Sequence, residues 1–155
     1  MFKISKFLVS LFGLGFFPKA PGTIGSIFAI IFFYLTIEYF SFLNLIIFFL
    51  ILFFLSKKLI DIYSINKNNH DSSEIIIDEF IGIFFIIIFY DYIKFTNHLT
   101  MFIIIFLLFR FFDILKIYPA NWIDKNLKSS FGVLLDDLVA AVYSIFVLLL
   151  INAFI

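Results

Sequence analysis

Residues 138–155 read LVAAVYSIFVLLLINAFI, a run of eighteen positions without a charged side chain. As a helix rising about 1.5 Å per residue, this run comes close to crossing a bilayer hydrocarbon core of about 30 Å. Residues 20–37 and 39–56 form two similar uncharged runs. The whole chain is 64% hydrophobic and 14% charged, against about 45–50% and about 25% in soluble domains. The sequence therefore predicts a helical membrane protein and excludes a water-soluble globule or a disordered chain.

The charge balance and the cysteine count limit the partners and the chemistry. Eleven Lys and Arg residues offset eleven Asp and Glu residues, so no basic surface for nucleic acid is expected. The chain has no cysteine, which excludes disulfides, thiolate metal ligands and cysteine nucleophiles. The length suits a single domain, residues 1–155. We expect the lipid bilayer as a partner, no nucleic acid and no obligate protein partner.

Two shorter apolar runs, residues 80–90 and 99–109, can span a bilayer only if they extend past charged residues, toward Ile75 and Lys116. We therefore predict an all-α, polytopic membrane helical bundle with about five membrane-embedded helices. Their expected ranges are 24–37, 42–55, 75–90, 99–115 and 133–155. The apolar residues 7–17 precede them without a signal-peptide cleavage site, so an N-terminal interfacial or re-entrant helix is expected.

The lysines predict the orientation of these helices. Residues 38–41 form a short connection between the first two spans, so the lysines that flank this pair of spans must lie on one side of the membrane. They are Lys3, Lys6, Lys19, Lys57 and Lys58. The positive-inside rule makes that side cytoplasmic. The carboxy terminus is then expected on the other side.

The charged residues of the last three spans share one depth. An ionised group near the centre of a membrane helix costs about 2.5–3.5 kcal/mol, so such groups normally mark function or are shielded by protein. All of these lie at predicted cytoplasmic ends: Asp78, Glu79, Arg110, Asp113, Lys116, Asp136 and Asp137. Carboxylates without histidine or cysteine suit a hard cation, and magnesium is the usual one beside phosphate. A plainer interpretation stays open, because the helix dipole alone favours acids at helix starts and bases at helix ends.

Residues 13–26 read GLGFFPKAPGTIGS and lead directly into the first span. Glycine permits close backbone approach, proline interrupts a helix, and Thr23 or Ser26 can cap the helix that follows. Free N–H groups at such a helix start attract phosphate oxygens. We predict a phosphate-binding segment with Gly22, Thr23, Ser26 and Lys19, although a simple hinge would look the same. A nucleotide-binding P-loop is excluded, because its Gly-Lys-Ser/Thr ending is missing.

Four sequence blocks follow one another along most of the chain. They are residues 13–26, residues 75–82 (IIIDEFIG), residues 109–119 (FRFFDILKIYP) and residues 132–140 (GVLLDDLVA). Together they resemble the phosphatidylglycerophosphatase A family, with one family-like domain over 1–155. The resemblance implies a phosphoric monoester hydrolase of the bacterial inner membrane that converts phosphatidylglycerophosphate to phosphatidylglycerol and phosphate with Mg2+ at a cytoplasmic-side site. Ile117, Phe131 and Ala141 depart from the family pattern, which has proline at the first position and glycine near the other two.

The charged layer and the resemblance together assign roles to the residues. The metal ligands are expected to be Asp78, Glu79, Asp136 and Asp137. The catalytic residues are expected to be Asp113, Lys116, Arg110 and Asp137. In this hypothesis Lys116 and Arg110 neutralise phosphate oxygens in the transition state. Either water attacks phosphorus in line, or a carboxylate attacks first and forms an acyl-phosphate, and both routes stay open.

The alternative function is a small cation transporter or channel subunit with a one-sided acidic ion site. A transporter should carry ionisable groups along a path through the middle of the membrane. The far ends of the predicted spans are nearly uncharged apart from Asp91 and Lys94, which favours the enzyme. Outside the predicted site, Asp61 is expected to be a solvated helix-end charge. Asp124 could reach the site but is more simply a surface charge.

Overall fold

The computed structural model describes residues 2–67, 72–93 and 97–154, so Lys94 lies outside the described residues. Within these ranges every regular element is a helix, which confirms the all-α class. The α-helices are α1 (Phe2–Val9), α2 (Pro21–Thr36), α3 (Phe42–Lys67), α4 (Ile77–Ile88), α5 (His98–Leu115), α6 (Ala120–Asn126) and α7 (Ser130–Phe154). Three short 3-10 helices join them: η1 (Leu14–Phe16), η2 (Ile37–Tyr39) and η3 (Tyr90–Tyr92).

Three helices in the described part of the chain are long and apolar enough to cross a membrane. They are Pro21–Tyr39, His98–Leu115 and Ser130–Phe154, with mean hydropathies of 1.5, 2.1 and 2.3. Less than half of each is buried inside the protein, so apolar faces remain for lipid. The structure therefore has three candidate membrane spans, while the count of about five embedded helices stays a prediction.

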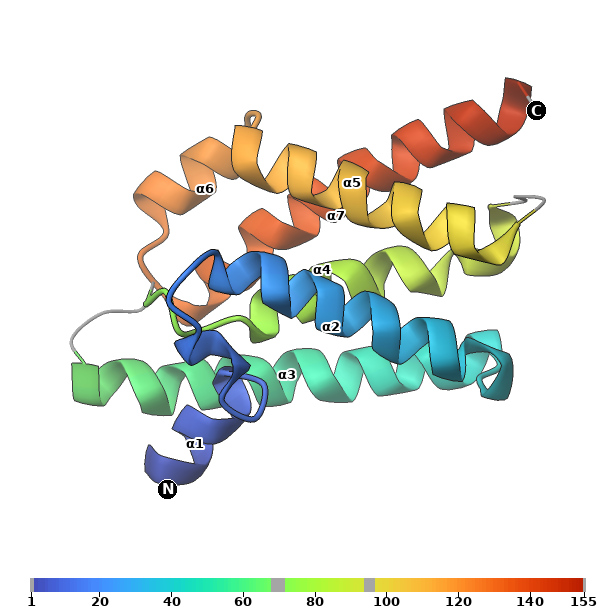
Figure 1. Ribbon diagram of the computed structural model, residues 1–155. Helices are drawn as coiled ribbons and strands as arrows, with labels where there is room; N and C mark the ends of the chain where they lie inside the picture. The colour runs from blue at the N-terminus through green and yellow to red at the C-terminus, as the bar shows by residue number, and fades with distance from the viewer. Residues whose placement is uncertain (1, 68–71, 94–96, 155) are drawn as a thin grey trace.

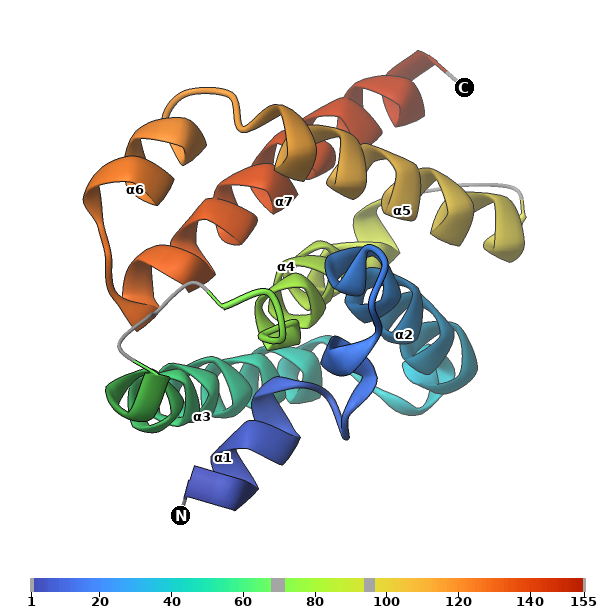
Figure 2. The same ribbon diagram turned by 60° about the vertical axis from the view of Figure 1, so that its left-hand side comes forward.

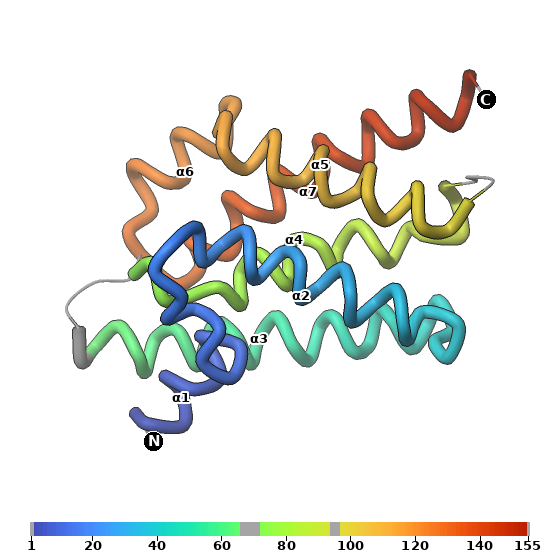
Figure 3. Tube along the Cα trace, in the orientation of Figure 1, coloured from blue at the N-terminus to red at the C-terminus, as the bar shows by residue number. Residues whose placement is uncertain are grey.

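The long helices lie side by side and alternate in direction (Figures 1 and 2). As a result, the starts of α2, α4 and α7 meet the ends of α3 and α5 at one end of the bundle, which we call the charged end (Figure 3). The short helix α6 also lies at this end, between α5 and α7. The amino terminus lies near the charged end, and the carboxy terminus at the other.

Helix α4 is the central element, because it packs against α2, α3, α5 and α7. Most of its residues are buried, as expected for a helix that is apolar on all sides. It covers Ile77–Ile88, twelve residues, instead of the predicted 75–90. At about 1.5 Å per residue it measures about 18 Å. Its hydrophobicity therefore reflects contact with the other helices, and not with lipid alone.

Phenylalanine and glycine shape the packing around α4. The ring of Phe84 lies 4.7 Å from that of Phe33 on α2 and 5.5 Å from that of Phe49 on α3. On another face, a Cβ atom at Gly82 would lie 2.5 Å from the nearest atom of the buried Phe109 ring of α5. It would also lie 3.3 Å from the Asp137 carbonyl oxygen of α7. Glycine at position 82 thus lets α5 and α7 approach α4 closely.

The amino-terminal segment is tied to the same end of the bundle. Helix α1 packs against α3, with the Phe2 ring stacked on that of Tyr63 at 5.6 Å. The Ile76 N–H donates to the Val9 carbonyl oxygen at 3.0 Å, which joins α1 to the start of α4. Ile4 and Phe7 are more than half exposed. The interfacial or re-entrant position of this segment relative to a bilayer stays a prediction.

Candidate active site

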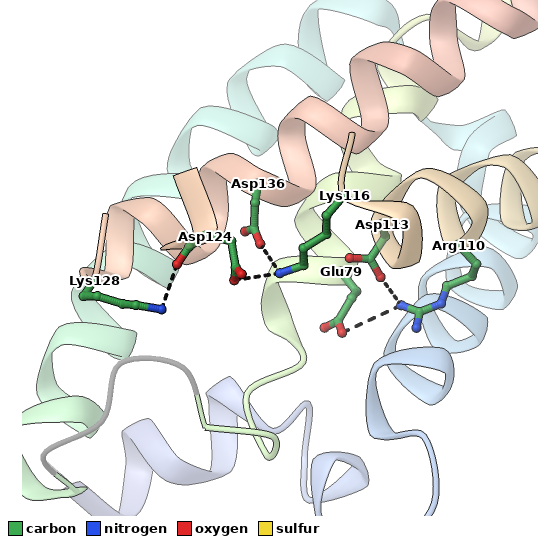
Figure 4. Close-up of polar contacts among 7 residues, drawn as sticks. All are labelled: Glu79, Arg110, Asp113, Lys116, Asp124, Lys128 and Asp136. Carbon is green, nitrogen blue, oxygen red and sulfur yellow. Dashed lines mark hydrogen bonds and ion pairs between the residues drawn. The ribbon is translucent and has the colours of Figure 1, made fainter. Parts of the chain in front are cut away.

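Charged side chains predicted from the sequence converge at the charged end of the bundle, and Figure 4 shows five of them: Glu79, Arg110, Asp113, Lys116 and Asp136. Asp78 and Glu79 lie in the first turn of α4. Asp136 and Asp137 lie in the second turn of α7, and both are buried. Arg110 and Asp113 belong to the last two turns of α5, and Lys116 directly follows that helix. Three helices far apart in sequence therefore place their charged residues in one region.

Three carboxylates form the centre of this region. One oxygen each from Asp78, Glu79 and Asp137 lies within 4.8 Å of the other two. Glu79 Oε2 and Asp137 Oδ2 are buried and have no hydrogen-bond partner among the described residues. Buried carboxylates without a partner are costly unless a cation neutralises them. A group of carboxylate oxygens without nitrogen or sulfur ligands fits a hard divalent cation, so these three residues fit the expected magnesium.

Asp136 has a different neighbour from Asp137. Its Oδ2 atom accepts a hydrogen bond from Lys116 Nζ at 2.8 Å, and it does not belong to the group of three carboxylates. Adjacent residues on a helix point about 100° apart, so only one of this pair can face the centre. Of the four metal ligands expected from the sequence, the structure brings Asp78, Glu79 and Asp137 together and directs Asp136 toward Lys116.

Arg110 links α5 to the carboxylate group. Its Nη1 atom lies 2.6 Å from Asp113 Oδ2 and 3.9 Å from Glu79 Oε1. The side chains of all three residues are at most 16% exposed. Arg110 Nε is buried and unpartnered among residues that the structure describes. The guanidinium therefore retains donor capacity that an anionic ligand can use.

Lys116 forms a second set of ion pairs beside the first. Its backbone is left-handed, with φ of 42°, and its Nζ atom donates to Asp124 Oδ1 at 2.7 Å and to Asp136 Oδ2 at 2.8 Å. Burial lowers the pKa of Lys116, but the hydrogen bonds to Asp124 and Asp136 outweigh burial and raise the pKa above the usual value for lysine. The ammonium group is therefore charged at neutral pH.

Asp124 and Asp61 differ from what the sequence indicated. Asp124 lies on α6, where its partly exposed side chain pairs with Lys116, so it reaches the charged end as well as the surface. The two are eight residues apart, and Lys116 follows α5 whereas Asp124 lies on α6, so no helical spacing could have indicated the contact. Asp61 on α3 pairs with Lys57 at 3.0 Å and accepts a hydrogen bond from the Ser130 hydroxyl at the start of α7. It therefore also connects helices.

The start of α2 reaches the same carboxylates. A Cβ atom at Gly22 would overlap Glu79 Oε1 and would lie 3.3 Å from Arg110 Nη1. A Cβ at Gly25 would lie 3.6 Å from Glu79 Oε2. Glycine at these two positions allows the backbone of α2 to lie directly against Glu79. The first turn of α2 therefore borders the site.

The capping of α2 differs from the prediction. The N-cap is Ala20, in a left-handed conformation and without a side-chain cap, and Pro21 begins the helix. Ser26 Oγ instead donates to the Gly22 carbonyl oxygen at 2.9 Å, within the helix. The first N–H groups of α2 thus have no side-chain cap, as a phosphate-binding helix start requires. Thr23 is partly buried, and Lys19 is exposed just before the helix.

Comparison with known proteins identifies the relatives of this chain. The profile of the family described as phosphatidylglycerophosphatase A matches residues 7–152. The Haemophilus influenzae protein named phosphatidylglycerophosphatase A is 33% identical over 136 residues, which cover 88% of this chain and 81% of the relative. The Escherichia coli protein of the same name is 33% identical over 138 residues, which cover 86% of this chain and 74% of the relative. No solved structure matches the chain significantly.

The family match includes every element that contributes to the site, from the start of α2 to the first turns of α7. It extends over nearly the whole chain, and both relatives align with most of their own length. The resemblance seen in the four sequence blocks is therefore confirmed. This chain belongs to the phosphatidylglycerophosphatase A family.

Proposed function

We propose that this chain is a membrane phosphatase that hydrolyses phosphatidylglycerophosphate to phosphatidylglycerol and inorganic phosphate. The names of the two bacterial relatives support this substrate. The observation that carries the proposal is the pair of buried, unpartnered carboxylate oxygens, Glu79 Oε2 and Asp137 Oδ2. The other oxygen of Glu79, Oε1, lies 3.9 Å from Arg110 Nη1. Cation-binding and anion-binding groups side by side suit a phosphate ester with its metal ion.

Asp78, Glu79 and Asp137 would hold the magnesium ion. When bound, magnesium would offset the repulsion among these carboxylates and withdraw charge from the phosphate oxygens. Arg110, held by Asp113, would donate to phosphate oxygens through its free N–H groups. Lys116, held by Asp136, would supply a second positive charge. The uncapped N–H groups of the first turn of α2 would add backbone donors.

Two routes of attack fit these residues. In the first, water attacks phosphorus in line and the glycerol oxygen of the lipid leaves with a proton. In the second, an aspartate carboxylate attacks phosphorus and forms an acyl-phosphate, which water then hydrolyses to regenerate the carboxylate. Rapid quenching with substrate labelled in its terminal phosphate separates them. Labelled protein supports the second route, and its absence during turnover supports the first.

We also infer an inner-membrane location with the site on the cytoplasmic side. The lysines of α1 and α6 support it, because both helices lie at the charged end (Figure 1). A phosphate on a lipid headgroup lies at the membrane interface, where the charged ends of apolar helices can meet it. The lipid tails can then remain in the bilayer during the reaction.

The test is phosphate release from phosphatidylglycerophosphate by the purified full chain in lipid nanodiscs, with thin-layer chromatography of the lipid product. We expect phosphatidylglycerol and phosphate to appear with Mg2+ and not with a chelator. No release in the presence of Mg2+ would reject the proposal. Cation flux into proteoliposomes without phosphate release would instead support the transporter alternative, which the one-sided cluster of carboxylates disfavours.

A further inference from the structure

We propose that Asp124 is a positioning residue for the phosphatase reaction, acting through Lys116. In this inference, Asp124 and Asp136 together fix the Lys116 ammonium so that one of its N–H groups is left for a phosphate oxygen. The inference rests on the proposed function. It adds a residue of α6, outside the helices that supply the carboxylate group, to the machinery of the reaction.

The distances around Lys116 carry this step. Its Nζ atom lies 2.7 Å from Asp124 Oδ1 and 2.8 Å from Asp136 Oδ2, both in the range of strong charge-assisted hydrogen bonds. An ammonium group has three donors at tetrahedral angles. When two donors are bound to carboxylates on different helices, the direction of the third is fixed. A single partner would leave the ammonium free to rotate, and a lysine side chain carries about 2 kcal/mol of rotamer entropy.

Helix α6 holds Asp124 in place independently of Lys116. Ala120 and Ile123 of this helix are buried, and α6 packs along α7. Before the helix, the Tyr143 hydroxyl of α7 donates to the Tyr118 carbonyl oxygen at 2.7 Å. Lys128 lies two residues beyond the helix, and its Nζ atom donates to the carbonyl oxygen of Asp124 itself at 2.8 Å (Figure 4). The packing of α6 on α7 and the hydrogen bond from Tyr143 thus hold this helix in place, so Asp124 can act as a fixed partner.

Asp124 also has an effect on Lys116 that would slow the reaction. The Asp124 carboxylate also neutralises Lys116, so its removal would leave more net positive charge for phosphate. The side chain of Asp124 is 29% exposed, against 10% for Asp136. Water screens the charge of the more exposed carboxylate, whereas a short hydrogen bond still restricts the ammonium. Loss of positioning therefore outweighs loss of neutralisation, and we expect removal of Asp124 to slow the reaction.

The test compares Asp124→Ala and Asp124→Asn with the same two substitutions at Asp91, an exposed aspartate on η3 at the opposite end of the bundle. For Asp124→Ala we expect kcat to fall about tenfold and KM to stay within about twofold, because the contact acts on the transition state. Asp124→Asn retains an acceptor oxygen and should lose less. The Asp91 variants should match the parent chain in both constants. Thermal unfolding of all four variants shows whether a loss of rate comes from a loss of stability. If Asp124→Ala does not fold, the rate of Asp124→Asn is compared with that of the Asp91 variants instead.

Three results would overturn the inference: Asp124 variants that match the Asp91 variants, a loss confined to KM, or a faster Asp124→Ala. The last result would mean that Asp124 mainly neutralises the charge of Lys116. Failure of the proposed function looks different, because the parent chain itself would then release no phosphate. An active parent chain with insensitive Asp124 variants rejects only the role of Asp124.

Discussion

Replacement of Gly22 by alanine tests whether the start of α2 and the Glu79 carboxylate share one space. The added Cβ would overlap Glu79 Oε1, and it would lie 3.1 Å from Glu79 Cδ and 3.3 Å from Arg110 Nη1. Ordinary contacts of a Cβ atom begin near 3.4 Å. The colliding group is the end of a flexible side chain, so the carboxylate can retreat and the fold can survive. Glu79 would then leave its place beside Asp78, Asp137 and Arg110.

The magnitude follows from this displacement. The overlap requires the carboxylate to move by roughly 1 Å, and misplacement on this scale costs about 10²-fold in rate. A 10²-fold loss in kcat/KM corresponds to about 2.7 kcal/mol of transition-state stabilisation. The free energy of unfolding should rise or stay unchanged, because alanine is favoured over glycine within a helix by up to about 1 kcal/mol. The variant should therefore be folded and nearly inactive.

The assay is phosphate release from phosphatidylglycerophosphate at saturating Mg2+, together with thermal unfolding of the same nanodisc sample. Ile31→Ala is the matched control, since Ile31 is an exposed residue farther along α2. It should retain the rate of the parent chain. A Gly22→Ala protein that keeps more than about a third of the parent rate would refute the reasoning. Glu79 would then either lie elsewhere or play no part in the reaction.

Three other substitutions test other contacts of the site. Asp137→Asn keeps the size of the side chain but removes one of the three carboxylates expected to hold magnesium. Phosphate release should fall at least about 10²-fold, and the Mg2+ concentration that gives half the maximal rate should rise. A full rate at the Mg2+ concentration that saturates the parent chain would contradict this role. Gly82→Ala places a Cβ atom 2.5 Å from the nearest atom of the buried Phe109 ring, so overpacking should destabilise the fold by about 1–3 kcal/mol. An unchanged unfolding midpoint in a thermal melt would argue against this packing. Arg110→Lys keeps the charge but loses the planar fork that binds Asp113 and an anion together, so kcat should fall at least about tenfold in the phosphate-release assay; equal rates would mean that charge alone suffices.

Part of the site was predictable from local pattern. The helix-start acids Asp78 and Glu79, and Arg110 with Asp113 three residues later, fall at helix ends that hydrophobic run lengths locate approximately. Charged residues directly beside such apolar runs are unusual whatever their partners. The Gly22 segment was also visible as an interruption before an apolar run. The roles assigned to these residues stay predictions.

The partners of the side chains required the tertiary structure. Asp136 and Asp137 are neighbours in sequence, but the rotation of α7 sends the first to Lys116 and the second to the carboxylate group. The contact between Lys116 and Asp124 crosses a turn between α5 and α6 and has no periodic signal. The closeness of Gly22 to Glu79 depends on how α2 lies against α4.

The amino-acid sequence by itself determined that this chain is helical and apolar enough to span a membrane, because run length and composition are local properties. It also determined that the charged residues gather near the ends of helices. Only the tertiary structure decided that α4 is enclosed by other helices and which carboxylate faces which cation. The physical reason is that contacts between helices depend on their relative rotation and distance, which arise from packing along their whole length and not from the spacing of residues within one helix.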